Sequence, residues 1–326
     1  RMSKVLSVDL TNRVARVEAG LTNIGISQAV AADGYFYAPD PSSQIACTVG
    51  GNVATNSGGA HCLKYGVTTN NILGVRMVLM SGEIIDIGGA SLDAPGYDFL
   101  ALITGSEGQL GVVTEVTVRL LKAAEGARPM LLGFDSNEAA GACVAGIIAA
   151  GIVPVALEFM DRPAIHVCEH FVKAGYPLDV EALLIVEVQG SEDEIDTLLE
   201  RIGEIALDFN PAMMRRSQSE EETTLIWKGR KAAFGAIGQL SDYYCMDGTI
   251  PRGRLAEVLT EIGALSARHG LRVANVFHAG DGNLHPLILY DARVAGQEEA
   301  AEQLGGDILR LCLRHGGSIT GEHGVG

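Results

Sequence analysis

The sequence predicts an α+β protein of two domains, and three observations support this prediction. The chain has 326 residues, enough for two domains that each bury a core. Strand patterns and Gly-rich loops dominate up to residue 121, whereas helix and strand patterns alternate after residue 127. Small residues at 123–127 separate the two regions as a linker. We expect one domain over residues 1–126 and a second over residues 127–326.

The first region is expected to begin with two short strands and a helix. Residues 4–9 and 13–18 alternate as strands, and Asn23 is suited to cap a helix that ends near Ala32. Further on, a β-hairpin around Ser81-Gly82 is expected. The region ends with a helical segment and the alternating strand 112–121.

Two Gly-rich loops interrupt this region, at 37–59 and 105–111, in a chain that contains 41 glycines. Two prolines oppose regular structure at the start of the first loop, and its Gly pairs allow close backbone approach. Exposed amides of Gly, Ser and Asn are suited to a pyrophosphate or a polar ring edge. Composition alone fits an ordinary surface loop equally well.

In the second region, strands and helices alternate with short connections, which predicts helices on one face of a mainly antiparallel sheet. A hairpin over 272–290 is expected at an edge of this sheet. The expected strands are 129–134, 155–160, 182–188 and 243–250, and the expected helices are 137–150, 163–174, 191–207, 217–237, 255–270 and 297–315.

The hairpin contains the strongest candidate for a metal site. Asp281-Gly282 is suited to a two-residue primed turn between β-prone runs. In that register His278 lies directly opposite His285 on one side of the sheet. Their Cβ atoms would be about 5 Å apart, close enough for two imidazoles to bind one divalent ion.

The tail offers the missing carboxylate. Glu322 is followed by another imidazole, His323. In an extended, Gly-flanked segment, neighbouring side chains point in opposite directions. One of the two can therefore bind a metal while the other acts as a base.

Composition excludes several kinds of partner. The chain is 47% hydrophobic and 20% charged, which is typical of soluble globular proteins. Its 40 acidic and 24 basic residues give a net charge of -16 without a basic stripe, which argues against nucleic acid. The uncharged stretch 140–157 contains Pro154 and is rich in Ala and Gly, so we expect no membrane span.

The six cysteines are dispersed without a CxxC pair, and we find no signal peptide. We interpret them as reduced thiols of a cytoplasmic protein. The chain begins close to a predicted strand and stops inside a Gly-rich motif, so we expect a fragment that lacks both ends.

The motifs in this order resemble a known family. They are Pro39-Asp-Pro-Ser-Ser43, Val49-Gly-Gly51, Asn56-Ser-Gly-Gly59, Gly105-Ser-Glu-Gly108, Phe277-His-Ala-Gly-Asp-Gly-Asn-Leu-His285 and Gly321-Glu-His-Gly324. The chain resembles, over essentially its whole length, the FAD-dependent D-2-hydroxy acid dehydrogenases of the vanillyl-alcohol-oxidase type. Among these it is similar to the FAD-binding D subunits of bacterial glycolate oxidases.

The resemblance implies a FAD-binding domain of the p-cresol-methylhydroxylase type over 1–126 and an α+β substrate-capping domain over 127–326. It implies a divalent ion held by His278, His285 and Glu322, with His323 as the base and Arg230 as the anchor of the substrate carboxylate. The residues implied to lie along FAD are Pro39, Ser43, Gly50, Gly51, Asn56, Ser57, Gly58, Gly59, Gly105, Ser106, Glu107, Gly108 and Gly111.

Two departures from the family pattern affect the expected function. The family's first pyrophosphate loop lies upstream of Arg1, and its C-terminal helix lies beyond Gly326, so this piece is expected to hold FAD weakly or not at all. Relatives that act on hydroxyglutarate have a Lys about where Cys245 stands. Without a cation there, a monocarboxylate such as glycolate or D-lactate fits better.

The expected chemistry assigns a task to each of these groups. A divalent ion lowers the pKa of a bound hydroxyl, His323 takes its proton, and the hydride passes to the flavin. Arg binds a carboxylate bidentately and stays charged, which favours Arg230 over Lys228 and Lys231, although an ordinary solvated helix charge has the same sequence signature. Zinc, manganese and iron all accept two His and one carboxylate.

The predicted function is oxidation of glycolate to glyoxylate, with D-lactate as the alternative substrate. The resemblance implies electron transfer to iron-sulfur and second flavin-domain subunits of a glycolate oxidase complex, and membrane association only through such partners. The cysteines here form no cluster that could hold an iron-sulfur centre. A metal hydrolase would not need the Gly-rich loops, and a non-catalytic flavin-binding subunit would not need His323.

Overall fold

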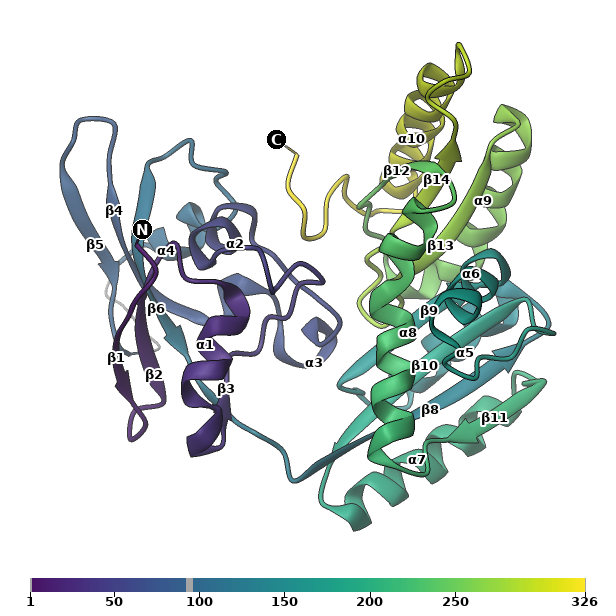
Figure 1. Cartoon of the computed structure of the whole chain (residues 1–326), viewed down its shortest axis with the longest axis horizontal. Coiled ribbons are helices and arrows are strands. Elements are labelled where there is room, and N and C mark those ends of the chain that lie inside the picture. Colours follow the sequence, from purple (N-terminus) through teal and green to yellow (C-terminus); the bar gives the residue numbers. More distant parts are fainter. Residues whose placement is uncertain (1, 92–95, 326) are drawn as a thin grey trace. The chain divides into compact units, whose positions relative to one another are not determined.

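The computed structural model of the chain describes residues 2–91 and 96–325. The chain forms two compact units (Figure 1). Unit 1 contains residues 1–123 and 322–326, and unit 2 contains residues 124–321. The sequence prediction had placed residues 322–325 in the second domain, whereas they belong to unit 1.

Unit 1 contains a five-stranded antiparallel sheet in the order β1-β2-β6-β4-β5. Its strands are β1 (Val5–Asp9), β2 (Val14–Glu18), β4 (Ile72–Val78), β5 (Ile84–Gly88) and β6 (Val112–Arg119). A separate pair is formed by β3 (Tyr35–Phe36) and β7 (Leu121–Lys122), and the helices are α1 (Asn23–Val30), α2 (Val49–Thr55), α3 (Cys62–Tyr65) and α4 (Phe99–Ile103). The predicted opening strands, first helix and hairpin are confirmed.

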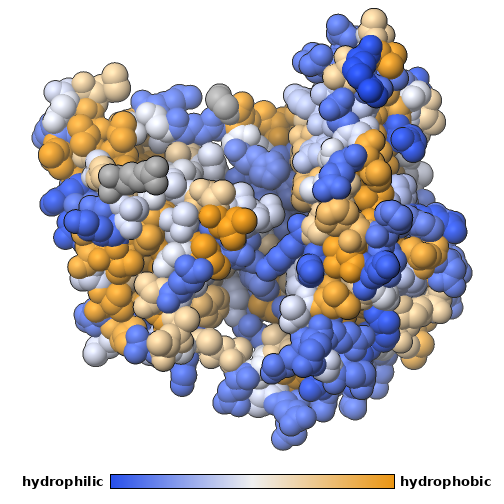
Figure 2. All heavy atoms as spheres, in the orientation of Figure 1, coloured by the Kyte–Doolittle hydropathy of each residue, from blue (hydrophilic) through white to orange (hydrophobic). Residues whose placement is uncertain are grey.

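The two faces of this sheet differ because side chains alternate along each strand. One face packs against α1 and α2 and forms the core of unit 1, which includes Val17, Met77, Val116, Ile26 and Val53. The other face is charged, and Arg76 forms ion pairs there with Asp86 and Glu115. Figure 2 shows hydrophobic side chains over the tip of the β4–β5 hairpin, where Met80 is 90% and Ile84 64% exposed.

The helix α2 was not predicted, because Gly50 and Gly51 lie inside it and disfavour a helix. Thr48 caps its start by accepting a hydrogen bond from the Gly51 N–H at 3.3 Å. Asn56 ends it in the left-handed conformation with a φ of 54°. The first Gly-rich loop therefore contains a short capped helix, which is not visible in its composition.

Unit 2 is built on a seven-stranded antiparallel sheet in the order β11-β8-β10-β9-β13-β14-β12. Its strands are β8 (Gly126–Phe134), β9 (Ala156–Asp161), β10 (Ala182–Gly190), β11 (Met213–Arg216), β12 (Asp242–Cys245), β13 (Arg272–His278) and β14 (Pro286–Tyr290). Its helices are α5 (Asn137–Ala149), α6 (Arg162–Val172), α7 (Glu192–Leu207), α8 (Glu220–Gly238), α9 (Leu255–His269) and α10 (Gln297–Arg314). The α+β class and the mainly antiparallel sheet are confirmed.

Helices cover both faces of this sheet, so the prediction of one covered face was wrong. The helices α6 and α8 pack on one face, and α8 crosses the strands there (Figure 1). The helices α5, α7, α9 and α10 contact the strands from the other face. The strands are apolar at consecutive positions, which is typical of strands buried on both sides. We call the face under α6 and α8 the α8 face.

The hairpin is longer at its turn than predicted. His278 pairs with Asn283 across a four-residue reversal, instead of with His285 across two residues. A type I′ turn needs positive φ at both central residues, and only Gly282 of the predicted pair has it, with φ of 82°. The Asp281 carboxylate instead accepts a hydrogen bond from the Asn283 N–H at 3.1 Å, as in an Asx turn.

The position of the hairpin in the sheet also differs from the prediction. Both of its strands are internal, because β12 forms the edge beyond β14 and β13 pairs with β9 on its other side. The strand β12 is short, and the predicted strand 243–250 continues as irregular chain after Cys245. This irregular chain carries Asp247 towards the hairpin.

No disulfide joins any of the six cysteines, all of which lie in the described part of the chain. None of the helices within residues 2–91 and 96–325 combines the length and the apolar character needed to cross a bilayer. The surface of unit 2 is hydrophilic around α7 (Figure 2), whose inner side buries Ile195, Leu199 and Ile202.

The turn at Gly282 gives a prediction about stability. A Cβ at Gly282 would lie 2.1 Å from the Ile250 carbonyl oxygen, whereas one at Gly270 (φ of 67°) would meet no atom within 4 Å. Both substitutions add left-handed strain of about 1–2 kcal/mol. Gly282→Ala should therefore destabilise the chain by about 3 kcal/mol or more, clearly beyond its control Gly270→Ala. Equal losses of unfolding free energy in a denaturant titration would contradict this account.

Candidate active site

Two histidines lie side by side at one end of the hairpin in unit 2. His278 ends β13, and His285 immediately precedes β14. Their ring centroids are 5.2 Å apart and the rings are nearly perpendicular, at 85°. The observed register differs from the predicted one by two residues, and a shift of two leaves each side chain on its original face. The two imidazoles are therefore neighbours despite the error in the turn.

A buried carboxylate lies behind His278. Glu158 on β9 is the register partner of His278 on β13, so both side chains point to the α8 face. The Glu158 oxygens lie 2.8 and 3.0 Å from His278 Nδ1. Glu158 is fully buried. Its contact with His278 follows from strand pairing and does not depend on a loop.

Arg230 completes this cluster from above the sheet. Its Nη2 lies 2.6 Å from Glu158 Oε2, and its side chain is only 6% exposed. The hypothesis of an ordinary solvated helix charge is therefore wrong. Burial raises the pKa of the Glu158 carboxyl, but the charges and hydrogen bonds of His278 and Arg230 outweigh this and hold the pKa below its usual range.

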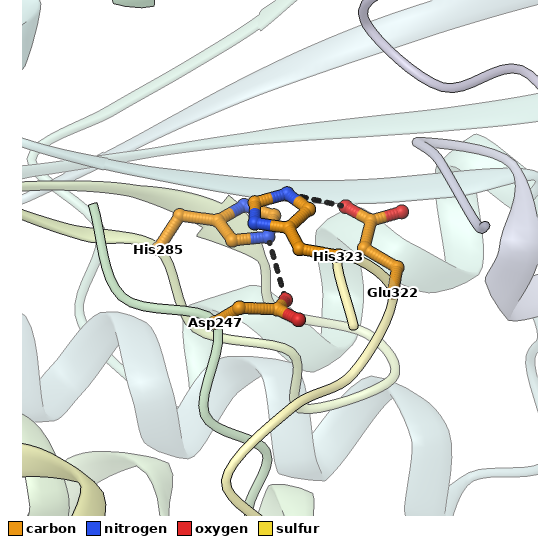
Figure 3. A group of neighbouring side chains, drawn as sticks. All are labelled: Asp247, His285, Glu322 and His323. Carbon is orange, nitrogen blue, oxygen red and sulfur yellow. Dashed lines mark ion pairs between the residues drawn. The ribbon is translucent and has the colours of Figure 1, made fainter. Parts of the chain in front are cut away.

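A second buried carboxylate lies next to His285. Asp247 Oδ1 is 3.3 Å from His285 Nε2, an ion pair drawn in Figure 3. The same carboxylate accepts hydrogen bonds from Asn283 Nδ2 at 2.8 Å, the Thr320 hydroxyl at 2.7 Å and the Gly321 N–H at 2.8 Å. Asp247 thus ties the end of unit 2 to the turn of the hairpin.

The two residues after Gly321 are Glu322 and His323. The chain bends at both of them, so the predicted extended segment with opposed side chains was wrong. Instead, His323 Nε2 lies 3.8 Å from Glu322 Oε1 (Figure 3). The Glu322 side chain is 11% exposed and that of His323 is 47% exposed.

Unit 1 contains a pocket of about 310 Å³ where several of the predicted FAD residues lie. Ser43, Gly51 and Ser57 contribute to its wall, together with Glu322 and His323. Further hydroxyl, thiol and amide groups come from Ser42, Thr55, Cys47 and Asn52. Hydroxyl groups and accessible backbone are suited to a polar ring edge or a phosphate, so the wall fits a flavin as ligand.

The two Gly-rich loops are hydrogen-bonded to each other. The Gly105 N–H donates to the Val53 carbonyl and the Glu107 N–H to the Ala54 carbonyl, both at 2.8 Å. The predicted loops thus meet at the C-terminal end of α2. Glu107 also accepts a hydrogen bond from the Val325 N–H at 2.7 Å, which holds the tail against unit 1.

At some of the predicted FAD positions, the packing of the chain itself already requires a glycine, without any ligand. A Cβ at Gly50 would lie 2.8 Å from Ala19 Cβ, and one at Gly59 would lie 2.4 Å from the Asp40 carbonyl oxygen. At Gly51 a Cβ would meet nothing closer than Thr48 Oγ1, at 3.4 Å. Gly51 therefore has open space beside its backbone, as do Gly105 and Gly108, where a Cβ would meet nothing closer than 3.5 Å.

A buried polar network supports this loop. Asn52 on α2 is 2% exposed and accepts a hydrogen bond from Asn23 Nδ2 at 3.1 Å. Its own amide donates to the Ser57 hydroxyl at 3.1 Å. Asn23 also donates to the Pro39 carbonyl at 3.0 Å, so this network connects the start and the end of the loop.

Sequence reasoning missed three polar residues of the site, Glu158, Asp247 and Asn52. Glu158 had a weak signal, because it is the one charged residue in the predicted strand 155–160. An isolated charge in an apolar strand indicates a buried partner. Asp247 had no such signal, because its role depends on where irregular chain passes the hairpin.

Two solved structures share the fold of this chain. A solved 4-ethylphenol oxidase from Gulosibacter chungangensis matches with a TM-score of 0.79 at 15% identity, over 99% of this chain and 71% of that one. A p-cresol methylhydroxylase structure matches with a TM-score of 0.76 at 14% identity, over 98% of this chain and 70% of that one. The chain has the vanillyl-alcohol-oxidase type of fold.

Residues 124–326 match the C-terminal domain of FAD linked oxidases, and residues 1–88 match a FAD binding domain. The chain therefore belongs to the FAD-linked oxidase family. Over its whole length it is 54% identical to glycolate oxidase subunit GlcD of Escherichia coli K12 and spans 66% of that protein. It is 32% identical to a D-lactate dehydrogenase of Anaerostipes hadrus, of which it spans 70%.

The lowered pKa of Glu158 predicts a pH-dependent stability. The folded state holds fewer protons than the unfolded state when the pH lies between the folded pKa and the usual value of 4.5. The ionised carboxylate thus stabilises the fold above 4.5, and this contribution is lost as the pH falls below that value. The free energy of unfolding of wild type should exceed that of Glu158→Gln near neutral pH, and this difference should shrink as the pH falls. Denaturant titrations with chelator present measure it. A constant difference between about pH 7 and about pH 3 would refute this assignment.

Proposed function

We propose that this chain takes part in the FAD-dependent oxidation of a small D-2-hydroxy acid, with glycolate as the substrate and glyoxylate as the product. The observation that carries this proposal is the pair of imidazoles at His278 and His285, whose ring centroids are 5.2 Å apart beside buried carboxylates. D-Lactate is the alternative substrate. The names of relatives at 54% and 32% identity support the two acids in that order.

The proposed metal ligands are His278, His285 and Glu322. Their donor types suit zinc, manganese or iron. Asp247, whose Oδ1 lies 3.3 Å from His285 Nε2, offers a further carboxylate in unit 2. The Gly321 N–H donates a hydrogen bond to Asp247, which lies beside His285. Glu322 is the next residue after Gly321, and consecutive Cα atoms are about 3.8 Å apart. A bound divalent ion would lower the pKa of a substrate hydroxyl.

His323 is the proposed base. Its ring lines the pocket of unit 1 together with Ser43, Gly51 and Ser57, which are proposed flavin contacts. A neutral imidazole can accept the hydroxyl proton of a 2-hydroxy acid. Because its side chain is 47% exposed, it can pass that proton on to water.

Arg230 is the proposed anchor for the substrate carboxylate. Its Nη2 contacts Glu158, while its Nε is buried and, within the described part of the chain, has no hydrogen-bond partner. A buried guanidinium stays charged and offers parallel N–H groups to a carboxylate. Relatives that act on hydroxyglutarate are expected to carry a Lys about where Cys245 stands, so the lack of a cation here favours a monocarboxylate over a dicarboxylate.

The flavin would lie along both Gly-rich loops of unit 1 and would accept the hydride. The loops meet at α2. The pocket wall contains small residues such as Gly51, Ser43 and Ser57, which leave room for a ligand. The proposed contacts are Pro39, Ser43, Gly50, Gly51, Asn56, Ser57, Gly58, Gly59, Gly105, Ser106, Glu107, Gly108 and Gly111.

The word subunit in the name of the GlcD relatives supports assembly into a complex. We propose iron-sulfur and second flavin-domain subunits as partners that receive the electrons. A cytoplasmic location, with contact to a membrane only through such partners, stays a prediction from the sequence.

Substrate choice can be measured by anaerobic bleaching of the flavin in the holoprotein. Glycolate and D-lactate should bleach the flavin, and D-2-hydroxyglutarate should do so at least about tenfold more slowly, because Cys245 leaves its second carboxylate unpaired. A chelator should slow bleaching by all three acids. Rapid bleaching by hydroxyglutarate would contradict the monocarboxylate assignment, and insensitivity to chelator would contradict the metal.

His323→Ala should abolish flavin reduction by glycolate while the flavin absorbance is retained, a loss on the order of a hundredfold or more. His166→Ala is the matched control, because His166 is an exposed histidine bonded to the Leu178 carbonyl. The control should reduce flavin at the wild-type rate. Unchanged reduction in His323→Ala would remove the proposed base and favour a non-catalytic flavin subunit.

A further inference from the structure

Glu158 is a charged residue within the apolar part of the sheet. It lies on β9, between β10 and β13 in the seven-stranded sheet, and its exposure is 0%. Burial of a carboxylate is costly unless it is paired, so a buried charge has partners that matter. Both partners of Glu158 are residues of the proposed site.

The first partner is His278, and strand pairing produces this contact. The two residues are directly paired across β9 and β13, which brings their Cβ atoms to about 5 Å. Both carboxylate oxygens lie within 3.0 Å of Nδ1, and the imidazole is edge-on to His285.

The second partner is Arg230, which reaches down from α8. Its Nη2 lies 2.6 Å from Glu158 Oε2, the oxygen that is 3.0 Å from His278 Nδ1. One carboxylate therefore contacts a proposed metal ligand and the proposed substrate anchor.

We propose that Glu158 is a positioning residue that sets the ring orientation and tautomer of His278 and the direction of the Arg230 guanidinium. This inference rests on the proposed function and deepens it. An ionised carboxylate can only accept hydrogen bonds, so Nδ1 of His278 carries the proton. In the neutral ring the lone pair then belongs to Nε2, the nitrogen with which His278 would bind a metal.

Two other buried carboxylates in the same sheet show what sets Glu158 apart. Asp161 accepts hydrogen bonds from the Asn275 N–H and side chain, both at 2.8 Å, and caps α6. Glu187 accepts one from Trp227 Nε1 at 2.6 Å. Neither Asn275 nor Trp227 is proposed to touch metal or substrate, whereas both His278 and Arg230 are.

The test compares Glu158→Ala and Glu158→Gln with wild type and with Glu187→Gln, which also removes a buried charge from this sheet. Zinc affinity of the holoprotein is measured by competition with a chelating dye. We expect a loss of roughly 10- to 100-fold in Glu158→Ala, and a smaller loss in Glu158→Gln, whose amide oxygen still accepts from Nδ1. Glu187→Gln should bind zinc as wild type does.

Steady-state kinetics provide a second measurement. Both Glu158 variants should raise the KM for glycolate, because Arg230 loses its partner, and Glu187→Gln should not. A merely structural role for Glu158 would lower the yield of folded protein without changing zinc affinity or KM per folded molecule. That result would overturn the proposal.

The tautomer of His278 can be read without any variant of Glu158. In zinc-depleted protein labelled with 15N-histidine, with the signal identified by its loss in His278→Asn, we expect the proton on Nδ1. A proton on Nε2 would overturn the proposal even if both Glu158 variants failed to fold.

These measurements separate this proposal from the proposed function. If wild type binds no divalent ion, the metal site fails, and the His278 tautomer still decides the role of Glu158. If wild type binds zinc tightly and the folded Glu158 variants bind it equally well, the metal site stands and the positioning role fails.

Discussion

The two-residue period of antiparallel strands is the constraint on which the candidate site depends. Glu158, His278 and His285 come from three neighbouring segments of one sheet, and each points to the α8 face because of its place in the alternation. Arg230 then meets Glu158 from the helix that covers that face. The site is therefore held by paired strands and a packed helix, which position side chains better than loops do.

Much of the fold could be predicted, because the features that define it are local. Strands 4–9 and 13–18, the helices of the second region and the antiparallel class follow from hydrophobic period and capping residues. The strand β11 and the helix α2 could not be predicted in this way. The four residues of β11 are too few to show a hydrophobic period. In α2, Gly50 and Gly51 have low helix propensity, and the helix is stabilised by its caps and its packing.

The part of the site that could be predicted is the histidine pair, because an error of two residues in strand register does not change the face on which a side chain lies. His278 and His285 share a face in the predicted register and in the observed one, because the two differ by an even number of residues. Glu158 and Asp247 depend on long-range pairing, which a single sequence does not reveal. The burial of Arg230 likewise became evident only once α8 was placed over β9.

The contacts that hold the candidate site join residues far apart along the chain. His278 and Glu158 are 120 residues apart, and Gly321 and Asp247 are 74 apart. A ribosome delivers β9 long before β13 or the tail, so the nascent carboxylate must stay hydrated while most of unit 2 is still being made. The contact between Glu158 and His278 can therefore form only after β13 has been synthesised, 120 residues after Glu158 itself.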